Sequence, residues 1–339
     1  MTQPAPAPVS APDTSSVPPA AGPSGRAAGV TALGGNRAAL TILLIQAVGG
    51  PLLMTRFGMD TVLAFIVTIA VNLTLLLTLF GREFAALRAD SRWRTPPSWG
   101  LALAVFIVAF IASRAWSAAA LAVFPDLPVP DTVPALASSS AGAWLMVLTG
   151  GVLVPIIEEI AFRGLMLRGH ERAAGFGVAA LTTTFAFALA HGVPLSVAGI
   201  LPLAYALARL AQHTGSLWNS VIVHVLNNAL VLGLVAALGD RLPLDEMQAG
   251  AGTGEAALSD LGPAVAAGAF VLGAGLLWVL HLWLTPRADP QERAAPGPWL
   301  SGAYAVILLF GLLGAALSFP AVGEWVRELI TARQALPVP

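Results

Sequence analysis

The chain has 339 residues, of which 57% are hydrophobic and only 10% are charged, and its net charge is −1. A soluble domain carries about 25% charged residues, so this composition, with a mean hydropathy of +0.79, predicts a membrane protein that crosses the bilayer repeatedly. The near-neutral charge excludes a large basic surface for nucleic acid. Cysteine and lysine are absent, which excludes disulfides, thiolate metal sites, cysteine or lysine nucleophiles and a Walker lysine.

The first 36 residues differ in composition from the rest of the chain. Residues 1–36 are rich in Pro, Ala, Ser and Gly, and we expect them to form a disordered tail. They lack an apolar core long enough for a signal peptide, so the first apolar run is expected to remain in the protein as a helix.

Long apolar segments then recur along the chain. Each can span a hydrocarbon core of roughly 30 Å, which needs about 20 residues, so we expect an all-α polytopic membrane protein with about eight or nine transmembrane helices. Three parts follow the tail: N-terminal helices over 37–140, a central core over 141–238, and accessory helices with a tail over 239–339. The expected helices cover residues 38–57, 61–81, 99–124, 141–170, 175–192, 195–213, 217–238, 263–284 and 299–319.

The arginines predict the orientation of these helices. Four arginines lie between Arg82 and Arg94, and two more, Arg168 and Arg172, lie at the turn after the fourth expected helix. The loop at 125–140 has aspartates and no arginine. Because cytoplasmic loops are enriched in arginine, we expect the N-terminus in the cytoplasm and the protein in the inner, cytoplasmic membrane.

Two adjacent glutamates interrupt the apolar segment 144–167. An ionisable group at membrane depth is costly and indicates a functional site. Glu159 and Arg163 are four residues apart with the acid first, which is the favourable order for a helical ion pair. Glu158 is rotated from Glu159 by about 100° around the helix. Glu159 and Arg163 are therefore expected to orient the site, while Glu158 is free to act as a general base or acid.

Two histidines on later helices are the expected partners of Glu158. Glu158 lies sixteen residues before Ala174 and His191 lies seventeen after it, so an antiparallel hairpin that turns near residue 175 places both at one depth. Phe187 shares the His191 face and is expected to pack there. His224 and Asn228 share a face of the seventh expected helix. We expect Glu158 and His191 to polarise a water, with His224 and Asn228 as hydrogen-bond donors to an oxyanion.

The sequence leaves open whether a divalent metal takes part. Glu158, His191 and His224 would be the ligands of a zinc ion with an open coordination position. The chain has no HExxH motif, however, and no second-shell carboxylate is evident for either histidine.

The motifs resemble one family in their order. They are EExxxR at 158–163, FxxxH at 187–191 and HxxxN at 224–228, which is similar to the CPBP family of CAAX-protease and bacteriocin-processing (abortive-infection) intramembrane peptidases. The resemblance covers about residues 141–238. It implies an all-helical membrane core, peptide-bond hydrolysis by an activated water without an acyl-enzyme, and Glu158 as the catalytic carboxylate. It leaves metal use open, because such enzymes are described as both glutamic and metallo-type.

The expected function is therefore an intramembrane endopeptidase acting on a peptide or membrane-protein substrate. Two alternatives stay open: a proton-coupled transporter that uses the same Glu/His cluster, and a non-catalytic scaffold or immunity protein. Transporters often contain inverted repeats, and the chain shows none. Two further polar residues are expected to lie outside the site. Arg114 should snorkel to the outer interface or pair with a carboxylate, and His170 should be solvated at a helix end.

Overall fold

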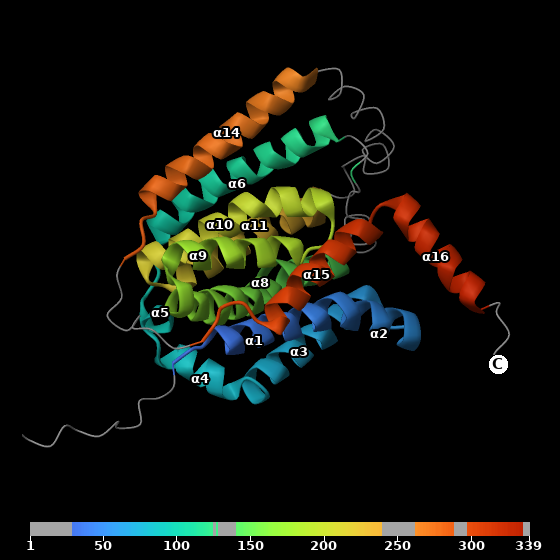
Figure 1. Ribbon diagram of the computed structural model, residues 1–339, viewed down its shortest axis with the longest axis horizontal. Coiled ribbons are helices and arrows are strands. Elements are labelled where there is room, and N and C mark those ends of the chain that lie inside the picture. The colour runs from blue at the N-terminus through green and yellow to red at the C-terminus, as the bar shows by residue number, and fades with distance from the viewer. Residues whose placement is uncertain (1–28, 125–126, 128–139, 239–261, 288–296, 335–339) are drawn as a thin grey trace, which may run out of the picture.

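The protein is an all-α polytopic membrane protein. The computed structural model describes residues 29–124, 127, 140–238, 262–287 and 297–334 (Figure 1). Within these ranges the regular elements are helices, without a strand. Seven helical segments are long and apolar enough to cross a membrane, and a bent pair at the C-terminal end adds an eighth.

The N-terminal helices form one side of the bundle. The first span runs from Ala32 to Phe57 and the next, α3, runs back along its second half. The expected loop that follows contains two short helices before α6 begins. The elements of this part are α1 (Ala32–Leu44), the π-helical turn η2 (Ile45–Gly49), α2 (Gly50–Phe57), α3 (Thr61–Thr78), α4 (Gly81–Ala89), α5 (Ser91–Arg94) and α6 (Trp99–Val123).

The prediction of a disordered tail up to residue 36 is wrong at its C-terminal end. Residues 1–28 lie outside the described residues, but α1 already begins at Ala32, where the Thr31 hydroxyl accepts from the Gly34 amide at 3.1 Å. Gly35 is buried, and a Cβ there would lie only 2.6 Å from the Met166 Cα, so the two backbones approach too closely for a larger residue. Gly35 is therefore a close-packed contact between α1 and the central core, and Gly34 beside it packs against Glu83 of α4.

The central core is a helical hairpin followed by two further helices. The segment Gly142–Leu189 is one of the seven spans and supplies two of the expected helices, because the chain reverses at Gly175, whose φ is 83°. The elements are α7 (Ser140–Leu148), η4 (Thr149–Leu153), α8 (Val154–Glu159), η5 (Ile160–Met166), α9 (Leu167–Leu189), α10 (Pro194–Thr214) and α11 (Leu217–Leu238). Both η4 and η5 are π-helical.

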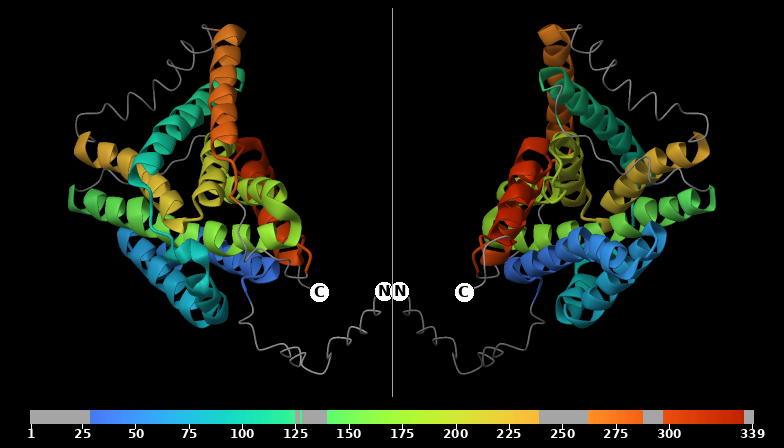
Figure 2. Two further views of the ribbon diagram at one scale, coloured as in Figure 1. Left: turned by 90° about the vertical axis from the view of Figure 1, so that its left-hand side faces the viewer. Right: turned by 90° about the vertical axis from the view of Figure 1, so that its right-hand side faces the viewer.

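Three C-terminal helices complete the bundle. They are α14 (Gly262–Trp283), α15 (Gly302–Leu317) and α16 (Pro320–Gln334). α14 packs along α6 on one side of the bundle, and α15 crosses the hairpin beside α1, as Figures 1 and 2 show. α16 leaves α15 at 98° and extends away from the body of the protein.

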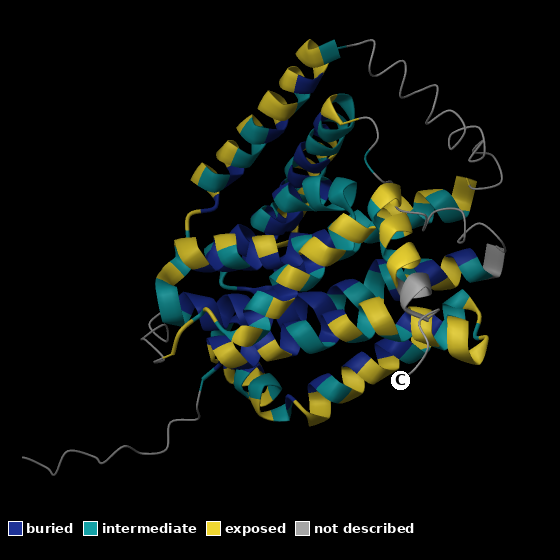
Figure 3. Cartoon of the chain, turned by 45° about the vertical axis from the view of Figure 1, so that its right-hand side comes forward, coloured by how far each residue is buried: buried dark blue, intermediate teal, exposed yellow. Residues whose placement is uncertain are grey.

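The hairpin and α10 lie at the centre. The most apolar stretch of each of these two spans is 56% buried, against 28% for the spans that contain α3 and α6 and 17% for α11 and α14. Figure 3 shows the buried positions gathered along the middle helices. The outer faces of the other spans are apolar and exposed, as expected for helices that contact lipid.

Buried ion pairs fix the Gly175 end of the hairpin. Arg92 donates to Glu171 at 2.7 Å, and Arg168 contacts Asp90 at 3.0 Å and the other oxygen of Glu171 at 3.5 Å. All four side chains are at most 9% exposed. Arg92 and Arg168, two of the arginines from which the orientation was predicted, therefore tie the α4–α5 segment to the hairpin.

The prediction of a solvated His170 is wrong. This histidine is fully buried, with Nε2 at 2.7 Å from Asn36 Oδ1 and Nδ1 at 2.7 Å from the Thr182 hydroxyl. The Asn36 amide in turn donates to the Trp299 carbonyl at 2.8 Å and the Ser301 hydroxyl at 3.0 Å. This cluster joins α1, both arms of the hairpin and the segment before α15.

Candidate active site

The hairpin brings the first two motifs level with each other. The rings of Phe162 and Phe187 are 5.0 Å apart between centroids, although a straight helix would separate residues 25 positions apart by about 37 Å. Glu158 lies one turn before Phe162 and His191 one turn after Phe187, so the reversal places them at a similar depth. The Phe187 ring contacts both histidines, with ring centroids 5.0 Å from His191 and 5.5 Å from His224.

Glu159 is the fully buried member of the glutamate pair. Its Oε1 accepts from Arg163 Nη1 at 3.0 Å, and this ion pair has the i, i+4 spacing that the sequence shows. The same oxygen accepts from His224 Nδ1 at 2.9 Å. Glu159 therefore connects the hairpin to α11 as well as to Arg163.

Arg163 is held on three sides. Its Nη1 faces Glu159, its Nη2 donates to the Ala204 carbonyl of α10 at 3.2 Å, and its guanidinium lies 4.2 Å above the Phe187 ring centroid. The side chain has no exposed surface. Such a contact set fixes the position of the cation, which suits an orienting residue better than a mobile proton carrier.

His224 is oriented by Glu159. An ionised carboxylate only accepts hydrogen bonds, so the 2.9 Å contact assigns a proton to His224 Nδ1. Nε2 then faces the other glutamate, at 3.8 Å from Glu158 Oε2. The expectation that neither histidine has a carboxylate partner is therefore wrong for His224, since a carboxylate–histidine pair fixes which ring nitrogen faces the site.

Glu158 is the carboxylate with free hydrogen-bonding capacity. Its side chain is 11% exposed, and no described side chain donates a hydrogen bond to it. The 3.8 Å to His224 Nε2 exceeds direct hydrogen-bond distance, and a water can bridge polar groups across such a gap. The Glu158 carboxylate is thus placed beside the fixed elements of the cluster without being locked into an ion pair.

His191 stands at the exposed edge of this cluster. It follows the end of α9, and its Nδ1 lies 2.9 Å from the Phe187 carbonyl. Because a carbonyl only accepts, Nδ1 donates and Nε2 is left with its lone pair. The residue is exposed, and the chain then turns through Gly192, whose φ is 68°, into α10.

Phe187 packs at the centre of the cluster. Its ring is only 2% exposed. It contacts the guanidinium of one motif and the histidine rings of the other two. The partners are Arg163 at 4.2 Å, His191 at 5.0 Å and His224 at 5.5 Å.

Asn228 joins α11 to the hairpin one turn beyond His224. Its Nδ2 donates to the Gly150 carbonyl at 3.4 Å, and its Oδ1 accepts from Asn227 at 3.0 Å. The helices approach closely here, because a Cβ at Gly151 would lie 3.1 Å from the Ala229 Cα. Nδ2 has two N–H groups, so one remains available for another acceptor.

The π-helical turns beside the glutamates were not predicted. η4 and η5 lie on either side of α8, which carries Glu158 and Glu159. The only sequence signals are Gly150, Gly151 and Pro155, which lacks an N–H for the helical hydrogen bond one turn back. π-Helical turns occur frequently at functional sites, and here they rotate the carboxylates relative to the rest of the hairpin.

The described residues offer no ready-made metal centre. They contain no group of three or more His, Asp or Glu side chains placed to hold a metal ion. Of the three expected ligands, Glu158 and His224 approach each other at 3.8 Å, and the neighbouring Glu159 holds the Arg163 cation at 3.0 Å in the same cluster. The cluster therefore does not fit a three-ligand zinc site in this geometry.

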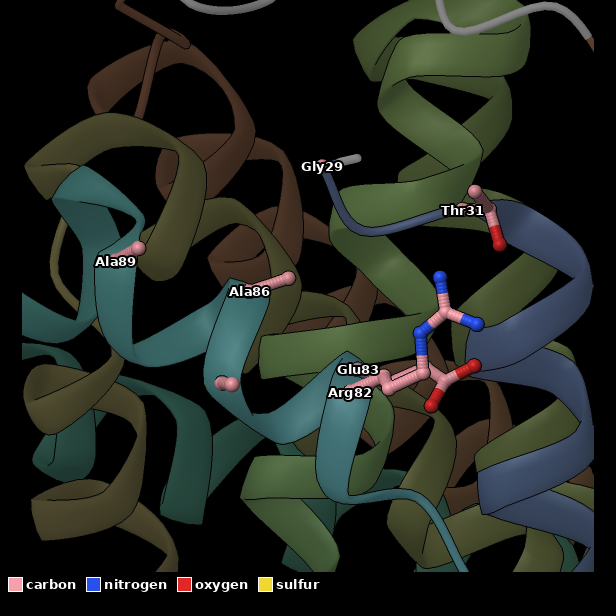
Figure 4. A pocket seen from close by; sticks show the side chains of 7 residues that line it. Gly29, Thr31, Arg82, Glu83, Ala86 and Ala89 are labelled. Atoms are coloured by element: carbon pink, nitrogen blue, oxygen red, sulfur yellow. The ribbon is translucent and has the colours of Figure 1, made fainter. Parts of the chain in front are cut away.

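The two larger of the hollows found among the described residues lie away from the cluster. One of about 510 Å³ lies between α4 and the start of α1 and includes Thr31, Arg82 and Glu83 in its lining, as Figure 4 shows. The other, of about 490 Å³, is almost wholly apolar and lies between α6, α10 and α14. Neither is lined by a motif residue.

Fold and site together define an α-helical membrane protein with a carboxylate, two histidines and an arginine clustered among its central helices. Residues 140–230 match the family model described as type II CAAX prenyl endopeptidase Rce1-like. The resemblance to the CPBP peptidases is therefore confirmed for this part of the chain, which contains all three motifs. Searches of curated proteins and of solved structures found no match. The family match supports a protease-type function in the membrane.

Proposed function

We propose that the chain is an intramembrane endopeptidase in which Glu158 activates the water that attacks the peptide bond. One observation carries the proposal. Glu159 is fixed through Oε1 by Arg163 at 3.0 Å and by His224 at 2.9 Å, whereas the nearest described cationic group to Glu158 is His224 Nε2, beyond hydrogen-bond distance at 3.8 Å. One carboxylate orients the site and the other is left for chemistry.

The attacking water would lie between Glu158 and His191. Glu158 takes one proton from the water, while His191 Nε2 accepts its other hydrogen as a hydrogen bond. The oxygen attacks the carbonyl carbon, giving a tetrahedral intermediate with a negative oxygen. Glu158 then returns the proton to the amine nitrogen as the C–N bond breaks. A positioned acid or base of this kind typically contributes a rate factor of about 100 to 10,000.

The oxyanion would be stabilised from α11. In its imidazolium form His224 carries one N–H held by Glu159 and a second on Nε2 that faces the reacting groups. The free N–H of Asn228 lies one turn further along the same face. Removing one such donor typically lowers the rate by about 100-fold or more.

The test compares proteolytic products in cells. Membranes from cells that express the wild type are compared with membranes from cells that express Glu158→Gln, and new peptide termini are quantified by mass spectrometry. We expect termini that the wild type generates and Glu158→Gln does not. Glu324→Gln, an exposed carboxylate on α16, is the matched control and should behave as wild type. Equal termini from wild type and Glu158→Gln would refute the proposal.

A further inference from the structure

Arg114 is a cation inside an apolar helix that the proposed mechanism does not use. It lies in α6, outside the matched residues 140–230. Its Nη2 donates to the Ser113 hydroxyl at 3.3 Å, and its guanidinium carbon is 5.4 Å from the Phe110 ring centroid. No carboxylate pairs with it among the described residues. A charge at this depth without a partner is costly and indicates function.

The side chain does not snorkel toward the nearer end of α6. Arg114 is nine residues from the C-terminal end of the helix at Val123 and fifteen from its start at Trp99. Its contacts, Phe110 and Ser113, both lie on the N-terminal side of it. The guanidinium is therefore directed toward the middle of the helix and stays at membrane depth. The prediction of a snorkelling arginine is not supported.

The neighbours of α6 show which way Arg114 faces. α14 contacts α6 at Trp116, where Gly273 leaves room for the indole, and α10 contacts it at Ser113, whose hydroxyl donates to the Gly199 carbonyl. At about 100° per residue, the order around α6 is Trp116, then Ser113, then Arg114. Arg114 thus lies on the side of the α6–α10 pair that faces away from α14.

The active-site cluster lies on that same side. On α10, Tyr205 bonds His281 of α14, Gly199 faces α6, and the carbonyl of Ala204 accepts from Arg163. The order around α10 is therefore α14, α6 and then the cluster. Both helices place α14 on one flank and the site on the other, so Arg114 and Glu158 share a flank.

The side chains around Arg114 on α6 and on the facing part of α11 are exposed. α11 contacts α6 near the start of both helices, where the Ser98 amide donates to Asn219 Oδ1 at 2.9 Å. Further along, the two helices run apart, as Figure 2 shows. Leu230 and Val231 on α11 and Ile107 and Ile111 on α6 are all exposed there. No described side chain therefore covers these positions on the flank that Arg114 faces.

The distance between Arg114 and the cluster suits a short peptide. Gly199, beside Arg114, is five residues from Ala204, beside Arg163, which corresponds to about 8 Å along α10. Neighbouring helix axes are about 8–10 Å apart. An extended chain covers about 3.3 Å per residue, so the two sites are separated by the length of a few residues.

We propose that Arg114 is a substrate-anchoring residue that binds a carboxylate a few residues from the scissile bond. The inference rests on the proposed peptidase function, since it assigns part of the same substrate. Guanidinium and carboxylate form a bidentate, charge-assisted pair, and the substrate carboxylate supplies the counter-ion that the described residues lack. Lipid headgroups lie outside the hydrocarbon core, so they do not reach a guanidinium directed to the middle of α6.

The experiment measures binding of matched peptides in nanodiscs. Because no substrate is identified, the probes are fluorescent apolar decapeptides that differ only at the C-terminus, carboxylate or carboxamide. The full chain carries Glu158→Gln so that no probe is cleaved, and affinity is read by fluorescence anisotropy. We expect the carboxylate probe to bind about 10- to 100-fold more tightly, as for a hydrogen bond to a charged group. Adding Arg114→Gln should abolish this preference, while Arg114→Lys keeps part of it.

Controls separate the possible results. Arg56→Gln removes an exposed charge at the end of α2 and should leave the preference unchanged. A carboxamide probe with an internal aspartate tests whether a side-chain carboxylate serves equally well, which would also support the anchor. No preference, or one that survives Arg114→Gln in a protein with unchanged thermal stability, overturns the proposal. If the preference depends on Arg114 but Glu158→Gln leaves cellular termini unchanged, the anion site stands and the peptidase proposal fails.

Discussion

The hairpin carries a buried charged cluster toward each of its ends, and only one of them is fully paired. Near Gly175, both oxygens of Glu171 accept from arginines, and Arg168 also reaches Asp90. At the other end, Glu159 accepts from Arg163 and His224 through Oε1 alone, while Glu158 has no ion-pair partner within 3.5 Å among the described residues.

The contrast distinguishes charged residues that stabilise the fold, such as Glu171, from a carboxylate available for catalysis, Glu158. A buried ion pair that is fully paired holds segments together, and breaking it leaves an uncompensated charge. Glu158 lies beside such a pair but has no ion-pair partner at hydrogen-bond distance in the part of the chain that the structure describes. Buried charges left in this state are expected at functional sites. The substitutions below test whether the two ends differ in this way.

The largest expected effect is that of Glu158→Gln on catalysis. Loss of the general base should lower the hydrolysis rate by about 100- to 10,000-fold, with little change in stability, because no hydrogen bond to Glu158 is broken. The rate is measured on a synthetic peptide that contains a cleavage site identified in membranes, and folding by the thermal midpoint in detergent. A variant that unfolds at a clearly lower temperature would place Glu158 with the structural charges instead.

Glu171→Gln should have the opposite profile. It removes the partner shared by Arg92 and Arg168, and breaking a buried pair typically costs about 3–5 kcal/mol. The free energy of unfolding in mixed micelles should fall accordingly, while the rate per folded molecule stays near that of the wild type. Glu159→Gln is the informative companion, because it should lower both stability and rate through the misoriented His224. Equal hydrolysis rates per folded molecule for Glu159→Gln and Glu171→Gln would contradict a catalytic role for one cluster and a structural role for the other.

Asn36→Ala tests the cluster that joins the hairpin to its neighbours. The change leaves His170 Nε2 and the Trp299 carbonyl without the partner that Asn36 provides, while His170 Nδ1 keeps Thr182, and a buried unsatisfied group costs about 1–3 kcal/mol. Thr74→Ala, which removes an exposed hydroxyl bonded only within α3, serves as the control. The free energy of unfolding should fall for the first and change little for the second. Similar values for both would show that the cluster contributes little.

The smallest effects distinguish two glycines at the turn. Gly175 has φ 83° and ψ 171°, a region that only glycine adopts readily, so Gly175→Ala should cost about 1–3 kcal/mol. Gly177 lies in the following helix with nothing within 4 Å of a Cβ, so Gly177→Ala should stabilise by about 0.4–1 kcal/mol. Opposite signs in the thermal midpoint are expected, and matching signs would contradict the reversal at Gly175.

The sequence predicts what depends on spacing along the chain. Apolar length locates the spans, the i, i+4 spacing predicts the Glu159–Arg163 pair, and equal distance from the turn predicts that Glu158 and His191 lie level. Contacts between helices far apart in sequence carry no such signal. The Glu159–His224 bond depends on the rotation of α11 and on the π-helical turns, and the burial of His170 depends on Asn36, 134 residues away.

The contact between Asn36 and the Trp299 carbonyl joins residues 263 positions apart. Synthesis at about 5–20 residues per second makes the second partner roughly 13–50 seconds after the first. The region that carries the motifs has therefore been synthesised before α14 and α15, which pack around it in the finished protein. Translation can be arrested before residue 299 or after α15, and the two chains compared by limited proteolysis. We expect the hairpin to be cut in the shorter chain and to resist cleavage in the longer one. The order of synthesis thus delays the contact that joins α1 to the segment before α15 until long after the motif residues have been made.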